Sequence, residues 1–127
     1  MQDVRHQRGR DGESISVAFL QFKGAQIVVR NWRPKSKIRG EIDIVALEEE
    51  CLCFVEVKTR SSVDFGEPQD AVNLTKQKQL AKLAAAFLSE RELTDVSYRF
   101  DVIEVWLLEG QKPRVNWIRD AFGARDW

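Results

Sequence analysis

Two nearly continuous apolar stretches lie in the middle of the chain. Residues 42–47 and 52–57 are rich in Ile, Val, Leu and Phe, a composition typical of strands that are covered on both faces. Only residues 48–51 separate them. Because a connection this short joins antiparallel strands, the pattern predicts a central β-hairpin.

Helical and strand patterns surround this hairpin. Residues 75–91 carry apolar side chains at helical spacing, which predicts a helix packed on the sheet; these side chains are Leu80, Leu83, Ala84, Phe87 and Leu88. We also expect a helix over residues 11–23, a loop that contains Gly66 and Pro68, and strands over residues 27–33, 98–108 and 115–118. The 127 residues are enough for one domain, with residues 1–10 expected to form a flexible basic arm.

Three charged side chains interrupt the predicted hairpin. If Glu48 pairs with Cys51 across the turn, Asp43 lies opposite Glu56 on one face of the sheet, and Lys58 follows on that face. Opposed side chains are separated by roughly 4.5–5.5 Å at Cβ, and like charges destabilise a sheet there unless a cation lies between them. A divalent metal with oxygen ligands meets that need. Lys58 would then lie at the edge of the site, where it can orient a water or offset charge on a phosphate.

A structural alternative remains open on the hairpin alone. The same register places Glu41 opposite Lys58, so these two residues can form an ion pair at the open end of the hairpin. Asp43 and Glu56 would then be solvated, as most charges at strand ends are.

The charge is balanced overall but not along the chain. There are 20 basic and 20 acidic residues, yet basic residues exceed acidic ones by six up to Arg39, and residues 41–56 then contain six acids and no Lys or Arg. A basic segment beside an acidic one is what a phosphate-binding surface next to a cation site would look like. The candidate contacts to a nucleic-acid backbone are Arg30, Arg33, Lys35, Lys37 and Arg39.

Two further candidates lie on the predicted helices. Glu13 shares a helical face with Val17 and Leu20, so its carboxylate can point toward the sheet; the alternative is an ordinary acid in a first helical turn. Lys76 lies at the N-terminus of the second helix, where a positive charge is unfavourable unless an anion is near. Lys76 and Lys78 are therefore either phosphate contacts or solvated surface lysines.

Several classes of function are excluded or disfavoured. Cys51 and Cys53 lie side by side on one strand, which makes a disulfide between them unlikely in geometry, and they lack the further ligands of a zinc site. His6 is the only histidine and lies in a charged segment, which argues against Ser-His and Cys-His hydrolases. No apolar run reaches the roughly 18 residues of a membrane span, and the N-terminus is charged. We expect a cytoplasmic protein with no membrane partner.

The pattern of Asp43 followed by Glu56-Val57-Lys58 on the next strand resembles the signature of the PD-(D/E)XK nuclease superfamily. More narrowly, the chain resembles the small bacterial YraN-type proteins, which are described as endonuclease-like. The motifs that carry this resemblance, in order, are Gly12-Glu13, Asn31-Trp32-Arg33, Gly40-Glu41-Ile42-Asp43, Val55-Glu56-Val57-Lys58, Phe65-Gly66-Glu67-Pro68, Lys76-Gln77-Lys78-Gln79-Leu80, Arg99-Phe100-Asp101-Val102 and Ala121-Phe122.

The resemblance implies an α/β fold with a restriction-endonuclease-like core, in which a central mixed β-sheet with an antiparallel hairpin is flanked by α-helices. It also implies that Asp43 and Glu56 bind a metal, that Lys58 is the catalytic lysine and that Glu13 is the acid of the first helix. Our leading hypothesis adds the Val57 carbonyl as a metal ligand and Mg²⁺ or Mn²⁺ as the cofactor.

The predicted activity is cleavage of phosphodiester bonds in DNA, including branched DNA, with RNA left open. Lys76 and the basic residues above would contact the backbone, and a branched junction would require a homodimer. Two rivals remain. One is a nucleic-acid-binding module with little or no turnover that acts with DNA-processing partners, and the other is a protein-interaction domain in which the charged hairpin is structural.

Overall fold

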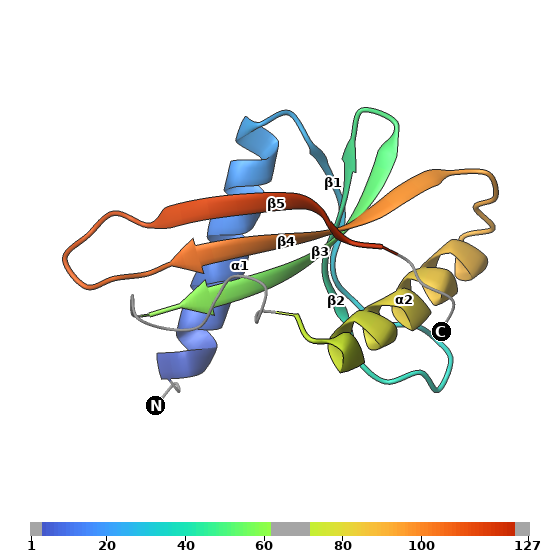
Figure 1. Ribbon diagram of the computed structural model, residues 1–127, viewed down its shortest axis with the longest axis horizontal. Helices are drawn as coiled ribbons and strands as arrows, with labels where there is room; N and C mark the ends of the chain where they lie inside the picture. Colours follow the sequence, from blue (N-terminus) through green and yellow to red (C-terminus); the bar gives the residue numbers. More distant parts are fainter. Residues whose placement is uncertain (1–3, 62–71, 124–127) are drawn as a thin grey trace.

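The computed structural model describes residues 4–61 and 72–123, with side chains from residue 10 onward. Within these residues, two helices and five strands follow one another (Figure 1). Their bounds are α1 (Val4–Phe22), β1 (Gln26–Trp32), β2 (Ile42–Glu48), β3 (Cys51–Arg60), α2 (Leu74–Glu90), β4 (Ser97–Trp106) and β5 (Arg114–Phe122). Among the described residues, no helix has both the length and the apolar content that are needed to cross a membrane.

The strands form one mixed sheet in the order β1-β2-β3-β4-β5. Neighbouring strands are antiparallel except β3 and β4, which run parallel. The connection between these two strands contains α2, consistent with the long crossover that a parallel pair requires. The predicted class is therefore confirmed as an α/β chain with a mixed sheet that contains an antiparallel hairpin.

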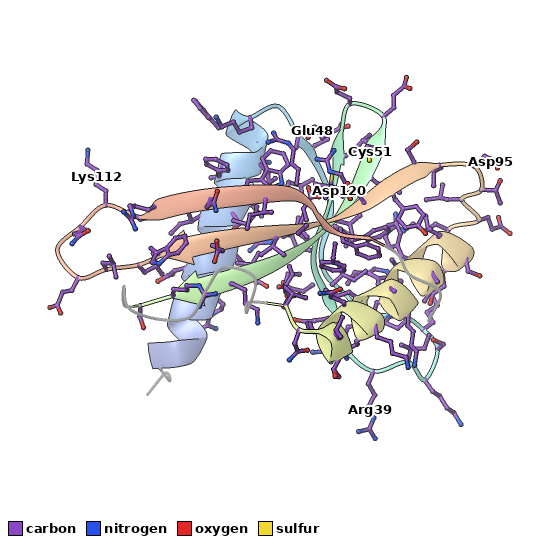
Figure 2. All side chains as sticks on the ribbon, viewed as in Figure 1. Arg39, Glu48, Cys51, Asp95, Lys112 and Asp120 are labelled. Atoms are coloured by element: carbon purple, nitrogen blue, oxygen red, sulfur yellow. The ribbon has the colours of Figure 1, made fainter. Side chains whose placement is uncertain are left out.

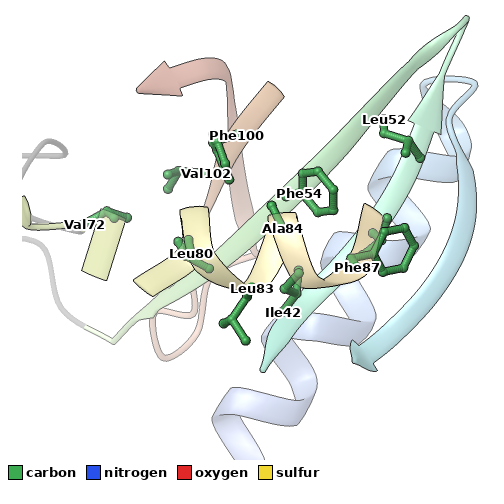
Figure 3. Packing of buried hydrophobic residues seen from close by; sticks show 11 residues of the cluster. Ile42, Leu52, Phe54, Val72, Leu80, Leu83, Ala84, Phe87, Phe100 and Val102 are labelled. Atoms are coloured by element: carbon green, nitrogen blue, oxygen red, sulfur yellow. The ribbon is translucent and has the colours of Figure 1, made fainter. Parts of the chain in front are cut away.

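The two helices lie on opposite faces of this sheet (Figure 1). Because side chains alternate between faces along a strand, each central strand contributes to both layers of the core. The α2 layer contains Val45, Leu52, Phe54, Phe100 and Val102 from the sheet and Leu80, Leu83, Ala84 and Phe87 from α2 (Figure 3). The α1 layer contains Leu20, Ile44, Ala46, Cys53, Val55, Ile103 and Val105. The predicted apolar stripe of α2 thus packs on the sheet, as expected.

The hairpin has the predicted register at its closed end. Glu48 pairs with Cys51, and Val45 pairs with Phe54. The ladder between β2 and β3 runs as far as Ile44 and Val55, whereas β3 continues beside β4 to its last residue. The two strands of the hairpin therefore diverge beyond this last pair, and the fork lies where Asp43 and Glu56 are found.

Other boundaries differ from the predictions. Helix α1 begins at Val4 and not at residue 11, so Glu13 lies in the body of the helix and not in its first turn. Strand β5 extends from Arg114 to Phe122, beyond the predicted residues 115–118. The loop predicted around Gly66 and Pro68 lies outside the described residues.

Both cysteines are free thiols, as predicted. The single domain and the basic arm over residues 1–10 stay predictions.

Candidate metal centre

The fork between β2 and β3 is organised by the side chain of Asp43. Its Oδ2 accepts a hydrogen bond of 2.9 Å from the backbone N–H of Val57. Val57 lies two residues beyond Val55, where the ladder between β2 and β3 ends. The N–H and C=O groups of a strand residue point to the same side. The Val57 carbonyl therefore points toward the fork, where the sequence predicts a metal ligand.

Glu56 lies on the wall of this fork. It is only 6% exposed, and its Oε1 is 3.8 Å from the Nζ of Lys76 at the start of α2. Its other oxygen, Oε2, is buried and has no hydrogen-bond partner among the described residues. Leaving a buried acceptor unpaired is costly, so this oxygen marks a position suited to a cation.

Burial and neighbouring charge disturb the protonation of both carboxyl groups. The pKa of Asp43 is raised to about 7, first by burial and then by repulsion from Glu56 and Glu13, against the opposing effects of the Val57 hydrogen bond and Lys76. Burial also raises the pKa of Glu56, although the charges of Lys76 and Lys58 lower it. Burial is the largest cause for both groups, and repulsion from neighbouring carboxylates adds to it only at Asp43.

A third and a fourth carboxylate approach the same fork. One carboxylate oxygen from each of Glu13, Glu41 and Asp43 lies within 4.8 Å of the others. The Nδ2 of Asn31 donates a hydrogen bond of 2.8 Å to Glu13 and a longer one of 3.5 Å to Glu41. Carboxylate oxygens are hard ligands that suit Mg²⁺ and Mn²⁺, so this cluster has the chemistry of a cation site. It contains Glu13 and Asp43 of the predicted set and adds Glu41, whereas Glu56 is not one of its three members.

Comparison with known proteins shows where this chain belongs. Residues 12–105 match the model of the family described as Uncharacterised protein family UPF0102. The chain belongs to the UPF0102 family. This confirms the resemblance to YraN-type proteins, and the matched region begins at Gly12 and contains every residue of the fork described above.

The relatives of this UPF0102 chain match it over nearly their whole length. A UPF0102 protein of Prosthecochloris aestuarii is 40% identical over 126 residues, which cover 95% of this chain and 97% of the relative. One from Caldicellulosiruptor saccharolyticus is 40% identical over 119 residues, covering 93% and 98%. A third, from Clostridioides difficile, is 42% identical over 116 residues, covering 91% and 96%.

The alternative in which Glu41 pairs with Lys58 is wrong for this UPF0102 chain. Glu41 instead forms an ion pair of 3.1 Å with Arg33 and accepts the bond from Asn31. Glu41 and Asn31 were both missed as site residues. The available signal was the position of Glu41 two residues before Asp43, because alternate residues of an extended chain share a face.

Two glycines, Gly12 and Gly40, allow the helices to pack closely beside the fork. A side chain at Gly12 would collide with the Oγ1 of Thr59, so the glycine lets α1 approach β3 next to Glu13. Gly40 has a φ of +110°, which favours glycine, and it lies against Gln79 and Leu83 of α2. Both acids that follow these glycines, Glu13 and Glu41, are therefore positioned by helix-to-sheet contacts.

Lys58 lies near the fork on β3. It is half-buried and close enough to Glu56 to lower the pKa of that carboxyl. Its neighbour in the parallel ladder is Glu104, which is fully buried and accepts hydrogen bonds from Arg60 and Asn116. The buried charge of Glu104, near the end of β4, was not singled out from the sequence.

The basic residues predicted to contact nucleic acid lie on β1 and on the loop that follows it. The side chains of Arg30, Arg33, Lys35, Lys37 and Arg39 are all exposed. Figure 2 shows Arg39 extending away from the body of the molecule below α2. Lys76, the sixth predicted contact, forms an ion pair with Glu56 in this structure.

A second polar cluster occupies the other end of the hairpin. Glu48 accepts hydrogen bonds from Arg99 and Arg119, and the fully buried Asp101 accepts from Arg99 and from the indole of Trp117. All of its charges are paired with opposite charges. We therefore assign this cluster to the stability of the sheet and not to the metal centre.

Proposed function

We propose that this UPF0102 protein is an endonuclease of the PD-(D/E)XK type that hydrolyses phosphodiester bonds in DNA with the help of Mg²⁺ or Mn²⁺. The observation that carries the proposal is that the buried carboxyl groups of Asp43 and Glu56 lie close enough for Glu56 to raise the pKa of Asp43, and that Oε2 of Glu56 has no hydrogen-bond partner among the described residues. Two acids on adjacent strands, followed by Lys58, match the order of the superfamily signature.

Asp43, Glu56 and the Val57 carbonyl would hold the metal directly, with Glu13 outside them. Glu41 is added to this set because it shares the cluster of Glu13 and Asp43. When bound, the metal lowers the pKa of an attacking water and offsets charge on the scissile phosphate.

The protein's own side chains supply the remaining steps. The Val57 N–H fixes the direction of the Asp43 carboxylate, and Asn31 holds Glu13 and Glu41 together. The ammonium group of Lys58 orients the attacking water and stabilises the charge that develops on the phosphate. Lys76 balances the charge of Glu56 before substrate arrives and can then turn to a phosphate.

DNA is the proposed partner. Arg30, Arg33, Lys35, Lys37 and Arg39 would contact its backbone without regard to sequence. If the substrate is a branched junction, two copies of the site related by a two-fold axis are needed, and the active form would be a homodimer. The fold proposed with this function is the restriction-endonuclease-like core.

A nucleic-acid-binding module without turnover is the second candidate. The ion pair between Lys76 and Glu56 favours it, because this contact occupies one of the two oxygens that a metal would use. Under this hypothesis Asp43→Ala would leave DNA affinity unchanged both with and without metal.

The test is cleavage of single-stranded, duplex, flapped and four-way-junction DNA in Mg²⁺ or Mn²⁺. We expect wild-type protein to cleave at least one of these, and Glu56→Ala and Lys58→Ala to lose that activity. Lys112→Ala, on the exposed loop between β4 and β5 (Figure 2), is the control and should cleave as wild type does. Cleavage that survives both site substitutions would reject the proposed function.

A further inference from the structure

A groove separates α2 from the loop that precedes β2. It has a volume of about 540 Å³, and its lining residues are Ile38, Arg39, Thr75, Lys78, Gln79 and Lys82. Gln79 ties the two walls together, because its Nε2 donates a hydrogen bond of 3.1 Å to the carbonyl of Arg39. Three of these six side chains are cationic and none is acidic.

The positive charge of this groove is not balanced by the surrounding protein. Lys78 and Lys82 are four residues apart on one helix, and like charges at that spacing repel each other. The first turn of α2 contains no acidic residue to offset the positive end of the helix dipole. Within the described part of the chain, Lys78, Lys82 and Arg39 form no ion pair. An anion in the groove would relieve this repulsion.

Both walls of the groove lead to the metal centre. On the loop side, Arg39 is followed by Gly40 and by Glu41, which belongs to the carboxylate cluster. On the helix side, Thr75 is followed by Lys76, which contacts Glu56. A chain of phosphates that lies in the groove would therefore continue toward the fork.

We propose that this groove binds the sugar-phosphate backbone of the nucleic-acid strand next to the bond that is cut, with Lys78, Lys82 and Arg39 contacting phosphates. The inference rests on the proposed function and adds to it the path of the strand. It assigns two lysines of α2 to binding, and it places their contacts between the helix and the loop, in addition to the contacts proposed for β1. An acidic protein segment is the competing occupant of the groove. It is the weaker candidate because a position beside the proposed hydrolytic site does not favour it.

The test compares two variants of equal net charge in the full chain. Lys78→Gln with Lys82→Gln neutralises two of the three cationic side chains of the groove, and Lys23→Gln with Lys112→Gln neutralises two exposed lysines on other parts of the surface. Binding of labelled single-stranded DNA, duplex DNA and RNA of one sequence is measured in EDTA over a range of salt concentration. Circular dichroism checks that each variant is folded.

We expect the groove variant to bind DNA more weakly and to show a shallower salt dependence. The slope of log K against log salt should decrease by about 1.4 for single strands and about 1.8 for duplex, since each lost phosphate contact removes about 0.7 or 0.9. The control variant should keep the wild-type slope on DNA, and RNA should follow DNA because the backbone is the shared ligand.

Three results would overturn the groove assignment. The first is an equal slope of log K against log salt for the two variants. The second is a groove variant that loses DNA binding but keeps RNA binding. The third is binding of polyglutamate that depends on Lys78 and Lys82 while DNA binding does not. Because these measurements need no metal, they are independent of cleavage. Retained cleavage in Glu56→Ala would reject the proposed function, whereas unchanged binding in the groove variant would reject only the path of the strand.

Discussion

Asp43 carries a proton that a bound cation would displace. Its pKa is raised to about 7 by burial and by the nearby carboxylates, so below neutral pH the carboxyl group is mostly protonated. A metal requires the deprotonated form. Divalent metal affinity should therefore fall as the pH drops below about 7, in contrast to an exposed aspartate, whose titration is complete well below that pH.

This leads to a calorimetric prediction for Asp43. Binding of Mn²⁺ at pH 6 should release close to one proton from Asp43 in wild-type protein, so the measured heat should depend on the ionisation enthalpy of the buffer. Asp43→Asn removes the titrating group and should reduce both the affinity and the proton release. Heats that are the same in every buffer would show that Asp43 does not lose its proton on binding.

Glu41 allows a second test at the scale of one residue. Its side chain is about one-third exposed, so Glu41→Gln should leave the melting temperature nearly unchanged. It should weaken Mn²⁺ binding about tenfold, which is the low end for residues that support metal ligands. Glu49→Gln, in the exposed turn of the hairpin, is the matched control. Equal Mn²⁺ affinities in the two variants would remove Glu41 from the site.

The sequence identified some of these residues and not others for a physical reason. Asp43, Glu56 and Lys58 are visible because charges interrupt apolar strands, and a regular hairpin register would place the first two opposite each other, although the observed ladder ends one pair before them. Glu41 was ambiguous, because a regular ladder would have placed it opposite Lys58. Only the fork, which ends the ladder at Ile44 and Val55, frees Glu41 to join the cluster.

Among the elements, the contact between α1 and β3 has the clearest consequence for the site. A Cβ atom at Gly12 would collide with Thr59, so Gly12→Ala requires a shift at this contact, and we expect α1 to move away from the sheet and displace Glu13. Overpacking of this kind destabilises a protein by about 1–3 kcal/mol. We expect a lower urea midpoint and weaker Mn²⁺ binding in this variant.

A double variant separates this clash from a general effect on the helix. Thr59→Ala removes the Oγ1 that the new side chain would meet, so Gly12→Ala with Thr59→Ala should recover part of the stability and of the Mn²⁺ affinity. Ser14→Ala, at an exposed position of α1, controls for the change in helix propensity. If the second substitution gives no recovery, the close approach does not position Glu13.

The cluster that joins β2, β4 and β5 gives a pH dependence of stability. Hydrogen bonds from Arg119 and Arg99 lower the pKa of Glu48 to about 2. A carboxyl with a lowered pKa stabilises the fold above its ordinary pKa, and this stabilisation is lost as the pH falls toward the folded value. Wild-type protein should therefore lose stability between about pH 4.5 and pH 2.

Glu48→Gln tests this linkage by denaturant unfolding across the same pH range. The variant should be less stable than wild type at neutral pH, and the difference should shrink on acidification. Glu50→Gln, in the exposed turn, should follow the wild-type curve. A constant difference between wild type and Glu48→Gln at every pH would contradict the assignment of the lowered pKa.

The elements themselves were predicted well where the apolar pattern was strong. The hairpin and α2 lie within a few residues of their expected bounds, because their cores are periodic and fully buried. The start of α1 was missed because residues 4–10 are mostly polar and offer no apolar period. Strand β5 was predicted too short because Arg119 and Asp120 interrupt its pattern, and both are held by distant partners, Glu48 and Asp101.

At the scale of the molecule, the candidate metal centre forms where it does because β3 has two different neighbours. It pairs with β2 only as far as Val55, and with β4 over its whole length. The fork that results is reached by Glu13 from α1 on one face and by Lys76 from α2 on the other. The local apolar pattern of the sequence predicts the hairpin. The fork, however, depends on the pairing of β3 with residues 97–106, which lie far from the hairpin along the chain.

The central claim is that Asp43 and Glu56 share one divalent cation. It is tested most directly by crystals of the protein grown with Mn²⁺ and measured near the manganese absorption edge. We predict an anomalous difference peak at the fork, in contact with carboxylate oxygens of Asp43 and Glu56, and no such peak in crystals of Glu56→Ala. A well-ordered fork without that peak, or manganese bound only elsewhere, would contradict the account.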